Sequence, residues 1–187
     1  AVLVVAGNIN FDKTKKMISN HFSSIPFREV RRNKYLFEPK KTERVQLNIK
    51  RDVPSKCIVL AFHMGGRLEQ SFYISKLTSY ILSSGVSSRM HDNLVMKQKF
   101  FSKIQTYLGE DFDASLFYVK AFLNDNIDYS FAEECIFNEL SSLSSLLISD
   151  KELIKVQKKN ESALRFSLLN NSYKAVDLAA GATLGNP

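Results

Sequence analysis

The sequence predicts an α+β domain of two layers, in which helices pack on one face of a mostly antiparallel sheet. The order of the strand-like and helix-like patterns carries this prediction, because strand–strand–helix–helix occurs twice and a further helix follows. Size and composition agree with it. The chain has 187 residues, close to the size of one domain, and its 44% of hydrophobic residues suffices for a core.

Residues 1–26 form the first compact unit. The continuous apolar run Val2–Val5 predicts a strand that is buried on both faces. A helix with an apolar face is predicted after it, with Asn10 as the N-cap. Ile25 and Pro26 then end this helix, since the residue before a proline disfavours the helical conformation.

Residues 27–43 form a basic connector, and residues 44–187 form the second unit, a domain expected to be truncated at its C-terminus. Between Arg28 and Arg51 there are nine lysines or arginines and three glutamates. A solvated linker is the favoured interpretation, and a patch for an acidic partner, substrate or polyanion is the alternative. Nucleic acid is not expected as a partner, because the basic run has few aromatic residues for stacking.

The second unit contains four predicted strands. Arg44–Lys50 alternates strictly between polar and apolar residues, which predicts a strand with one buried face. Cys57–Phe62 is apolar throughout and predicts a central strand. Further along, Phe101–Tyr107 and Ser115–Leu123 predict an antiparallel hairpin.

Two helices are predicted between these pairs of strands. Gly85 separates them, because glycine readily adopts the positive φ at which helices end. Ser87 or Ser88 is the expected N-cap of the second helix, since a serine hydroxyl can accept a backbone N–H.

Three further helices are predicted after the hairpin. The first has Asp128 as its expected N-cap. The second begins with Ser149–Glu152, which has the spacing of a capping box. The third begins at Asn170 or Ser172 and is expected to reach residue 181.

No local motif in the sequence builds an active site. His21, His63 and His91 stand too far apart for a zinc motif, and neither His-x-x-Glu-His nor Cys-x-x-Cys occurs. Folding could bring His63 and His91 together on a metal, but ordinary surface or core histidines are the favoured interpretation. Cys57 and Cys135 are expected to be buried reduced thiols, with a disulfide or a metal pair as the alternative. No apolar run is long enough to span a membrane.

Several motifs resemble those of the pitrilysin/insulinase family of zinc metallopeptidases, which includes the mitochondrial processing peptidases. Val4–Asn8 (VVAGN), a helix and Phe22–Pro26 (FSSIP) resemble the family's strand–Gly-Asn/Asp–helix–Phe-x-x-Ile-Pro unit. Ile81–Met90 (ILSSGVSSRM) is similar to its Leu-x-x-Gly-x-Ser-Ser-Arg-Leu signature. Asp111–Phe117 (DFDASLF) resembles its acidic turn before a strand, and Leu184–Pro187 (LGNP) resembles its closing motif. Together the motifs cover essentially the whole chain.

The resemblance implies a noncatalytic second-half domain. In the family, two homologous halves enclose the substrate, and the first half carries the zinc ligands and the glutamate that activates water. The chain is therefore expected to have no catalytic residue, metal ligand or cofactor of its own, with zinc in a first half outside it. The expected partners are the other half of the same protein or a homologous subunit, with a dimer as one arrangement, and an extended peptide substrate. The implied compartment is a bacterial cytoplasm or periplasm.

The resemblance leaves two functions open. In the first, the parent protein is a zinc metalloendopeptidase and this chain forms a wall of its peptide-binding chamber. In the second, the parent has no proteolytic activity and the chain serves as a binding or assembly subunit, as related noncatalytic partners do in the family.

Three residues are candidates for a substrate contact or a structural role: Arg89, Lys97 and Tyr107. Family members hold the substrate carbonyl with an arginine and, seven positions later, a tyrosine. The matching positions here are Val95 and Ser102, which supply neither the charge nor the phenol hydroxyl. Lys97 and Tyr107 lie nearby but ten positions apart, so the role is not transferred to them. Arg89 is expected to anchor the helix corner by an ion pair.

The unit at residues 1–22 is expected to pack against the sheet of residues 44–187, within or between chains. It would replace a closing strand and helix that the family has at the end of each half. The motivation is the apolar run Val2–Val5, which would otherwise be exposed.

Overall fold

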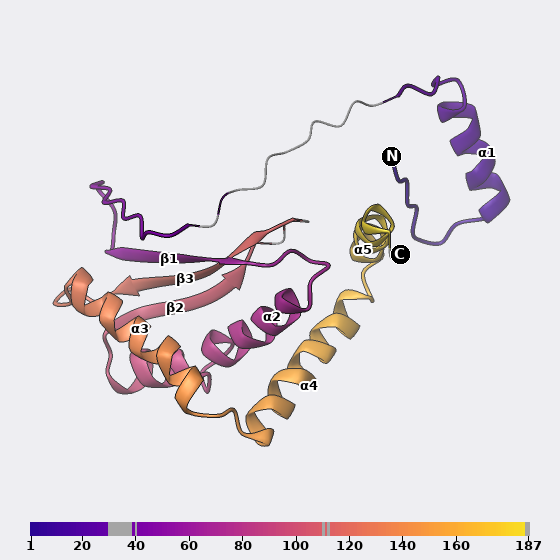
Figure 1. The fold of residues 1–187 in the computed structure, drawn as a ribbon. Helices are drawn as coiled ribbons and strands as arrows, with labels where there is room; N and C mark the ends of the chain where they lie inside the picture. The colour runs from indigo at the N-terminus through magenta and orange to yellow at the C-terminus, as the bar shows by residue number, and fades with distance from the viewer. Residues whose placement is uncertain (30–38, 40, 110, 112, 186–187) are drawn as a thin grey trace. The chain divides into compact units, whose positions relative to one another are not determined.

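The computed structural model describes residues 1–29, 39, 41–109, 111 and 113–185. These residues form three strands and six helices (Figure 1). In chain order the elements are α1 (Phe11–Phe22), β1 (Cys57–Met64), α2 (Gln70–Ser83), η1 (His91–Lys97), β2 (Phe101–Leu108), β3 (Ser115–Leu123), α3 (Tyr129–Ser145), α4 (Asp150–Ser167) and α5 (Asn171–Leu184).

The chain divides into two compact units, which we describe separately. Residues 5–52 form the smaller unit, which contains α1, a helix without buried residues. Ala1–Val4 and Val53–Pro187 form the larger unit, which contains the sheet and the other helices. The division expected from the sequence, into 1–26, 27–43 and 44–187, stays a prediction. Most of its basic connector, residues 30–38 and 40, lies outside the described residues.

The three strands form one antiparallel sheet in the order β1-β3-β2. The hairpin predicted from the sequence is confirmed, since β2 and β3 are adjacent and antiparallel. Along β3 every second residue, from Ser115 to Leu123, is buried and the residues between are half-buried. The strand therefore has two faces of different environment, as the two-residue period of a strand requires.

The hydrophobic core lies under one face of this sheet. Figure 1 shows α2 and α3 on this side, and the core residues come from these helices, η1 and the strands. Leu82 of α2, Ile136 of α3 and Val119 of β3 are fully buried, and Phe101 of β2 is 1% exposed. The α+β class with helices on one side of an antiparallel sheet is confirmed.

Side-chain caps at helix N-termini confirm several expectations. The side chains of Asn10, Asp128, Ser149 and Asn170 accept backbone N–H bonds at the starts of α1, α3, α4 and α5. Each cap satisfies an N–H that has no partner inside its helix. α5 continues to Leu184, beyond the end expected at residue 181. In the described part of the chain, no helix is long and apolar enough to cross a membrane.

Two of the predicted strands are wrong. Val2–Val5 and Arg44–Lys50 have no strand structure. Val2, Leu3 and Val5 are 43–56% exposed, and Val45, Leu47 and Ile49 are 67–78% exposed. A strand needs a neighbour to pair its backbone groups, and among the described residues neither segment has one. The expected packing of residues 1–22 against the sheet, within or between chains, stays a prediction.

The position predicted for Cys57–Phe62 is also wrong. These residues form β1, but β1 is an edge strand and β3 is the central one. In the described sheet, β1 has β3 as its only neighbour. Val59, which a central strand would bury, is 52% exposed.

The corner between α2 and η1 follows the prediction only in part. Gly85 has φ 100°, as expected for a glycine that ends a helix. The serines, however, do not cap the next helix. Ser88 donates its hydroxyl proton to the carbonyl of Gly85 at 2.6 Å, and Ser87 accepts a bond from Lys155. The next helix winds as a π-helix from His91 to Lys97, a form that pattern-based prediction does not distinguish from an α-helix.

Candidate functional site

The second face of the sheet, which we call the open face, is not covered by any described element of the larger unit. Its residues alternate with the buried ones along each strand. Val59, Ala61 and His63 of β1 are exposed, as are Lys103, Gln105 and Tyr107 of β2. The central strand contributes Leu116, Tyr118, Lys120 and Phe122, which are half-buried because strands flank them on both sides.

A pair of stacked tyrosines forms one half of the open face. Tyr107 of β2 and Tyr118 of β3 are directly opposite in the strand register. Their ring centroids are 5.0 Å apart and the rings are inclined by only 17°, so that each ring lies on the face of the other. Tyr107 is nevertheless 45% exposed. Such a cross-strand pair holds its rings in one orientation while leaving their outer surfaces accessible.

Two lysines and a phenylalanine form the other half. Lys103 of β2 is opposite Phe122 of β3, and the Lys120 Nζ lies 5.2 Å from the centre of the Phe122 ring. A cation at this distance is attracted by the electron-rich face of the ring. Within the described residues neither lysine forms an ion pair. The strands contain no aspartate or glutamate, so the open face carries positive charge alone.

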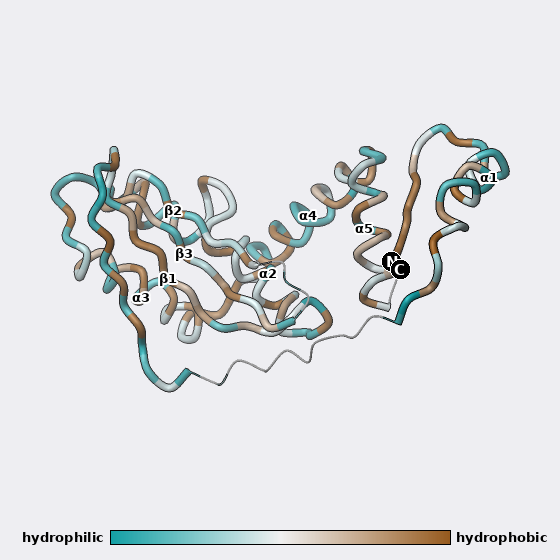
Figure 2. Tube along the Cα trace, turned by 90° about the horizontal axis from the view of Figure 1, so that it is seen from above, coloured by the Kyte–Doolittle hydropathy of each residue, from teal (hydrophilic) through white to brown (hydrophobic). Residues whose placement is uncertain are grey.

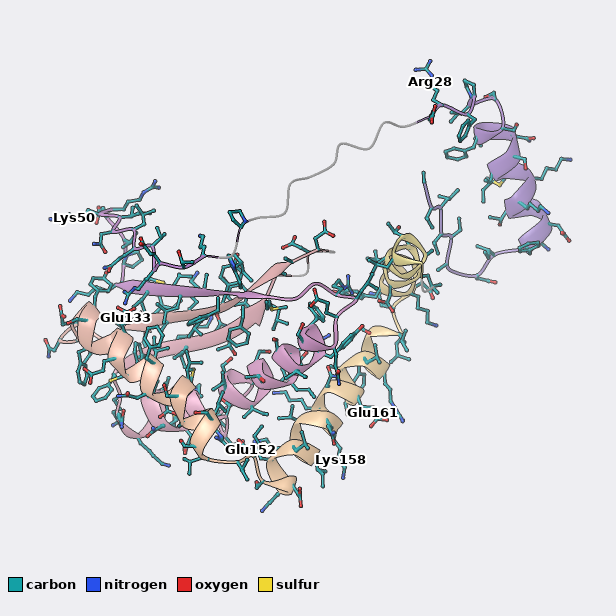
Figure 3. The ribbon with its side chains drawn as sticks, in the orientation of Figure 1. Arg28, Lys50, Glu133, Glu152, Lys158 and Glu161 are labelled. Carbon is teal, nitrogen blue, oxygen red and sulfur yellow. The ribbon has the colours of Figure 1, made fainter. Side chains whose placement is uncertain are left out.

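Arg89 lies outside this face, in the corner between α2 and η1. Its Nε and one terminal nitrogen each donate to an oxygen of Glu152, both at 2.9 Å, and the other terminal nitrogen donates to the Leu146 carbonyl. The hydrogen bond with Arg89 is the main cause that lowers the pKa of the Glu152 carboxyl from its ordinary value, and the same bond raises the pKa of Arg89. The bidentate geometry fixes the corner to the first turn of α4, where Figure 3 labels Glu152.

Two more residues of α4 extend this contact. Lys155 donates to the hydroxyl and the carbonyl of Ser87, and Lys159 donates to the Ser84 carbonyl at 3.0 Å. The three α4 residues are spaced by three and four positions, so they share one face of the helix. Figure 2 shows the mixture of hydrophilic and hydrophobic residues along α4, in which only Val156 is buried. We call this set of polar contacts the α4 seam.

Lys97 is separated from both Tyr107 and Arg89. It lies in the last turn of η1, whose Leu94 packs in the core beneath the covered face, and it binds Asp92 at 2.7 Å. Both side chains of this ion pair are largely exposed. The structure therefore does not bring the three candidate residues together, and a substrate contact of any of them stays a prediction.

The positions that match the family's arginine and tyrosine also differ from that role. Val95 packs against the core, and the hydroxyl of Ser102 donates to the Phe122 carbonyl at 3.3 Å. Sequence reasoning singled out Tyr107 but missed Tyr118, Lys103 and Lys120. The alternation of β2 and β3 placed these residues on one face of each strand. Only the register between the strands shows that they form one surface.

The described residues do not provide a site for a metal ion. No group of three or more histidine, cysteine, aspartate or glutamate side chains is close enough together among them to hold one. Cys57 and Cys135 are both free thiols, and burial raises the pKa of Cys135. The disulfide alternative is therefore wrong. No metal-dependent step is assigned to this chain.

Comparison with family models gives one match. Residues 1–160 match the model described as the peptidase M16 inactive domain. A search of curated proteins finds no match.

Solved structures share the fold at low sequence identity. A protease from Helicobacter pylori superposes with a TM-score of 0.87 and 22% identity, over 97% of this chain and 44% of its own. The periplasmic protease PqqL from Escherichia coli gives a TM-score of 0.69 and 16% identity, over 97% of this chain and 21% of its own. The inactive peptidase domain of a Bordetella parapertussis protein named as a zinc protease gives 0.63 and 21%, over 74% and 76%. The chain thus spans less than half the length of the first two proteins.

Proposed function

Because the chain belongs to the family of peptidase M16 inactive domains, we propose that it forms the noncatalytic wall of a peptide-binding chamber. The family match supports the expectation that the chain is a noncatalytic second-half domain of a zinc-peptidase-like protein. The proposal adds the chamber and places its lining on the open face of the sheet. Catalysis would then belong to a separate half, which in a zinc peptidase supplies the metal that activates water.

The observation that carries this proposal is that the open face is apolar in part although solvent reaches it. Tyr107, Val59 and the half-buried Phe122 lie on strands whose other side already supplies the core. Folding of this chain does not require them to be apolar, since solvent reaches them. An exposed apolar surface that is rimmed by polar groups is typical of an interaction site.

An extended peptide is the ligand that fits such a surface best. Along each strand the side chains on one face repeat about every 6.6 Å, and an extended peptide that lies along the strands places its own same-side side chains at the same pitch. The edge of β1 without a described partner offers a second mode, in which a peptide strand adds to the sheet by backbone hydrogen bonds. The proposal for the open face requires contact with the tyrosines, whereas edge addition requires contact with β1.

Tyrosine ring signals in the nuclear magnetic resonance spectrum distinguish these modes. The 187-residue chain is titrated with a mixture of unstructured peptides. We expect the ring signals of Tyr107 and Tyr118 to shift, while those of Tyr129 and Tyr173, exposed on α3 and α5, stay unchanged. Shifts confined to amide signals of β1 would favour edge addition. Unchanged spectra at peptide concentrations of about 1 mM would contradict peptide binding altogether.

A binding or assembly subunit without proteolytic activity in its parent is the second candidate. It is favoured by the apolar side chains exposed at the end of α4 and along α5, where Phe166, Leu169 and Val176 are 66–77% exposed. Such a surface suits contact with another polypeptide, either the other half of the same protein or a homologous subunit. Assaying the complete parent protein against unstructured peptides, with and without a chelator, decides between the two functions. Chelator-sensitive cleavage supports the peptidase, and lack of cleavage supports the assembly subunit.

A further inference from the structure

We propose that the open face selects extended peptides in which an acidic residue lies four positions from an aromatic or large aliphatic residue. This inference rests on the proposed peptide-binding role and adds the class of substrate. It follows from how charge and aromatic groups are distributed along the strands.

The first observation is the sign of the charge. Lys103 and Lys120 are the only Lys, Arg, Asp or Glu side chains on the strands, and they lie together at the end of the face where β2 begins. Asp128, which follows β3 near the same end, is engaged in capping α3 through Ser130. Asp111 and Asp113 belong to the turn at the opposite end of β2. A peptide carboxylate is therefore attracted to the lysine end, and a peptide cation is repelled from it.

The second observation is the spacing. Lys103 and Tyr107 lie four residues apart on β2, a separation of about 13 Å in a strand. A peptide lying along the strands in an extended conformation places its own side chains i and i+4 on one side at the same distance. Its carboxylate then reaches Lys103 and Lys120, while its apolar side chain meets Tyr107 and Tyr118.

The contacts that the aromatic rings make within the protein favour a peptide over a nucleic acid as the ligand. Tyr107 and Tyr118 stack on one another, and the Lys120 ammonium lies over Phe122. One face of each ring thus has a partner inside the protein. Single-stranded nucleic acids bind by stacking bases on free aromatic faces along a cationic groove. The tyrosine hydroxyl groups and the two ammonium groups of the open face can instead bind polar side chains of a peptide.

Fluorescence anisotropy with the complete 187-residue chain tests the proposal. The probe is a labelled, glycine- and serine-rich peptide of about twelve residues with one glutamate and one phenylalanine four positions apart, so that both lie on the same side when it is extended. Variant peptides replace the glutamate by glutamine or lysine, or move the phenylalanine by one position to the other side. We expect the order glutamate, glutamine, lysine in affinity, with a gap of about fivefold at each step. The shifted peptide should bind more weakly than the original.

Matched protein variants locate the effect. K103E and K120E should each weaken binding of the glutamate peptide about fivefold and strengthen binding of the lysine peptide. K151E changes the net charge equally on α4 and should leave both affinities unchanged. Y107A should weaken binding of the glutamate, glutamine and lysine peptides, whose phenylalanine faces the tyrosines, whereas Y129A, at a tyrosine that is 47% exposed on α3, should not. Four of the five positions are exposed and Lys120 is half-buried, outside the hydrophobic core, so circular dichroism should show the same fold in every variant.

Each remaining outcome overturns the proposal in a distinct way. Equal binding of the glutamate, glutamine and lysine peptides removes the charge selection but leaves peptide binding intact. Absence of binding to every peptide contradicts the proposed function as well. Tighter binding of an oligothymidine than of the glutamate peptide, with the same loss in K103E, would identify the face as a site for nucleic acid.

Discussion

The covered and the open face of the sheet are formed by alternate residues of the same strands, but only the covered face lies in the hydrophobic core. On the covered side of β3, Val119, Ala121 and Leu123 are 0–3% exposed and lie in the hydrophobic core. On the open side of the same strand, Leu116, Tyr118 and Phe122 are comparably apolar but only half-buried. The apolar residues on the covered side stabilise the fold, because folding removes them from water.

The open side needs another explanation. A sheet that only had to remain stable in water would carry polar residues there, as antiparallel sheets with one solvated face usually do. The apolar residues found among the polar ones agree with the proposed peptide contact. The two faces should therefore respond differently to substitution: changes on the covered face should alter the free energy of unfolding, and changes on the open face should alter ligand affinity.

Truncating a fully buried side chain on the covered side should produce the largest change. Leu82→Ala removes part of a side chain that is 0% exposed in the core, and we expect the free energy of unfolding to fall by about 3 kcal/mol. Val59→Ala on the open face should lower it by less than about 0.5 kcal/mol. Urea unfolding followed by circular dichroism measures both. Equal losses in the two variants would mean that the open face is covered in solution.

The α4 seam should give the next largest effect. Glu152→Gln removes the carboxylate that accepts two hydrogen bonds from Arg89, and the side chains of this pair are 19% and 22% exposed. We expect a loss of about 1–2 kcal/mol in the free energy of unfolding, because bonds to a charged group at a partly buried site exceed those at an exposed one. Glu161→Gln, at an exposed ion pair on the same helix, is the matched control and should cost far less.

The same pair predicts a dependence on pH. Hydrogen bonding to Arg89 lowers the pKa of Glu152 in the folded state, so its contribution to stability is fully present above the ordinary glutamate pKa and is lost as the pH falls through the folded value. Wild type and Glu152→Gln should therefore differ by a constant amount between pH 6 and 8 and converge only as the pH falls below the ordinary glutamate pKa and through the lower folded value. A difference that persists unchanged in acid would show that the carboxylate charge is not what stabilises the seam.

Local sequence patterns sufficed to predict single strands, helix caps and turns, because neighbouring residues determine these features. Ser115–Leu123 is β3 to the residue, and Asp128 and Ser149 cap the helices that they were expected to cap. The turn at Gly85 follows from the freedom of glycine at positive φ. The family resemblance, confirmed by the model match over residues 1–160, carried the noncatalytic assignment.

The wrong strand assignments concern pairing between distant segments. Arg44–Lys50 has the alternation of a strand, yet alternation describes the face that a strand would bury and not whether a neighbour exists to pair it. The edge position of β1 in the described sheet likewise depends on which strands pair, which its apolar run does not reveal. On the open face, Lys103 and Phe122 lie opposite one another on two strands. This contact depends on a strand register that the sequence alone does not determine. Glu152, the partner of Arg89, lies 63 positions away, so no local pattern identifies it.

The tyrosine pair provides a finer test of the open face. Single replacement of Tyr107 or Tyr118 by alanine and their combination form a double-mutant cycle, and we expect a coupling of about 0.5–1 kcal/mol in the free energy of unfolding, as measured for aromatic pairs. The same cycle in ligand affinity should show a larger coupling, since both rings would contact one side chain of the peptide. Coupling in stability without any coupling in affinity would make the stack purely structural.

The smallest effect is expected at Lys97, which the sequence singled out beside Tyr107. Its ion pair with Asp92 is exposed to solvent at both ends, so Lys97→Ala should lower the free energy of unfolding by less than about 0.5 kcal/mol. Because it is carried by η1, beneath the covered face, the substitution should also leave peptide affinity unchanged, in contrast to the equal change of charge at Lys103. Urea unfolding and the anisotropy titration measure the two quantities on the same preparation. A loss of affinity in Lys97→Ala as large as that in Lys103→Ala would break the distinction between the faces, because it would place the bound peptide over η1.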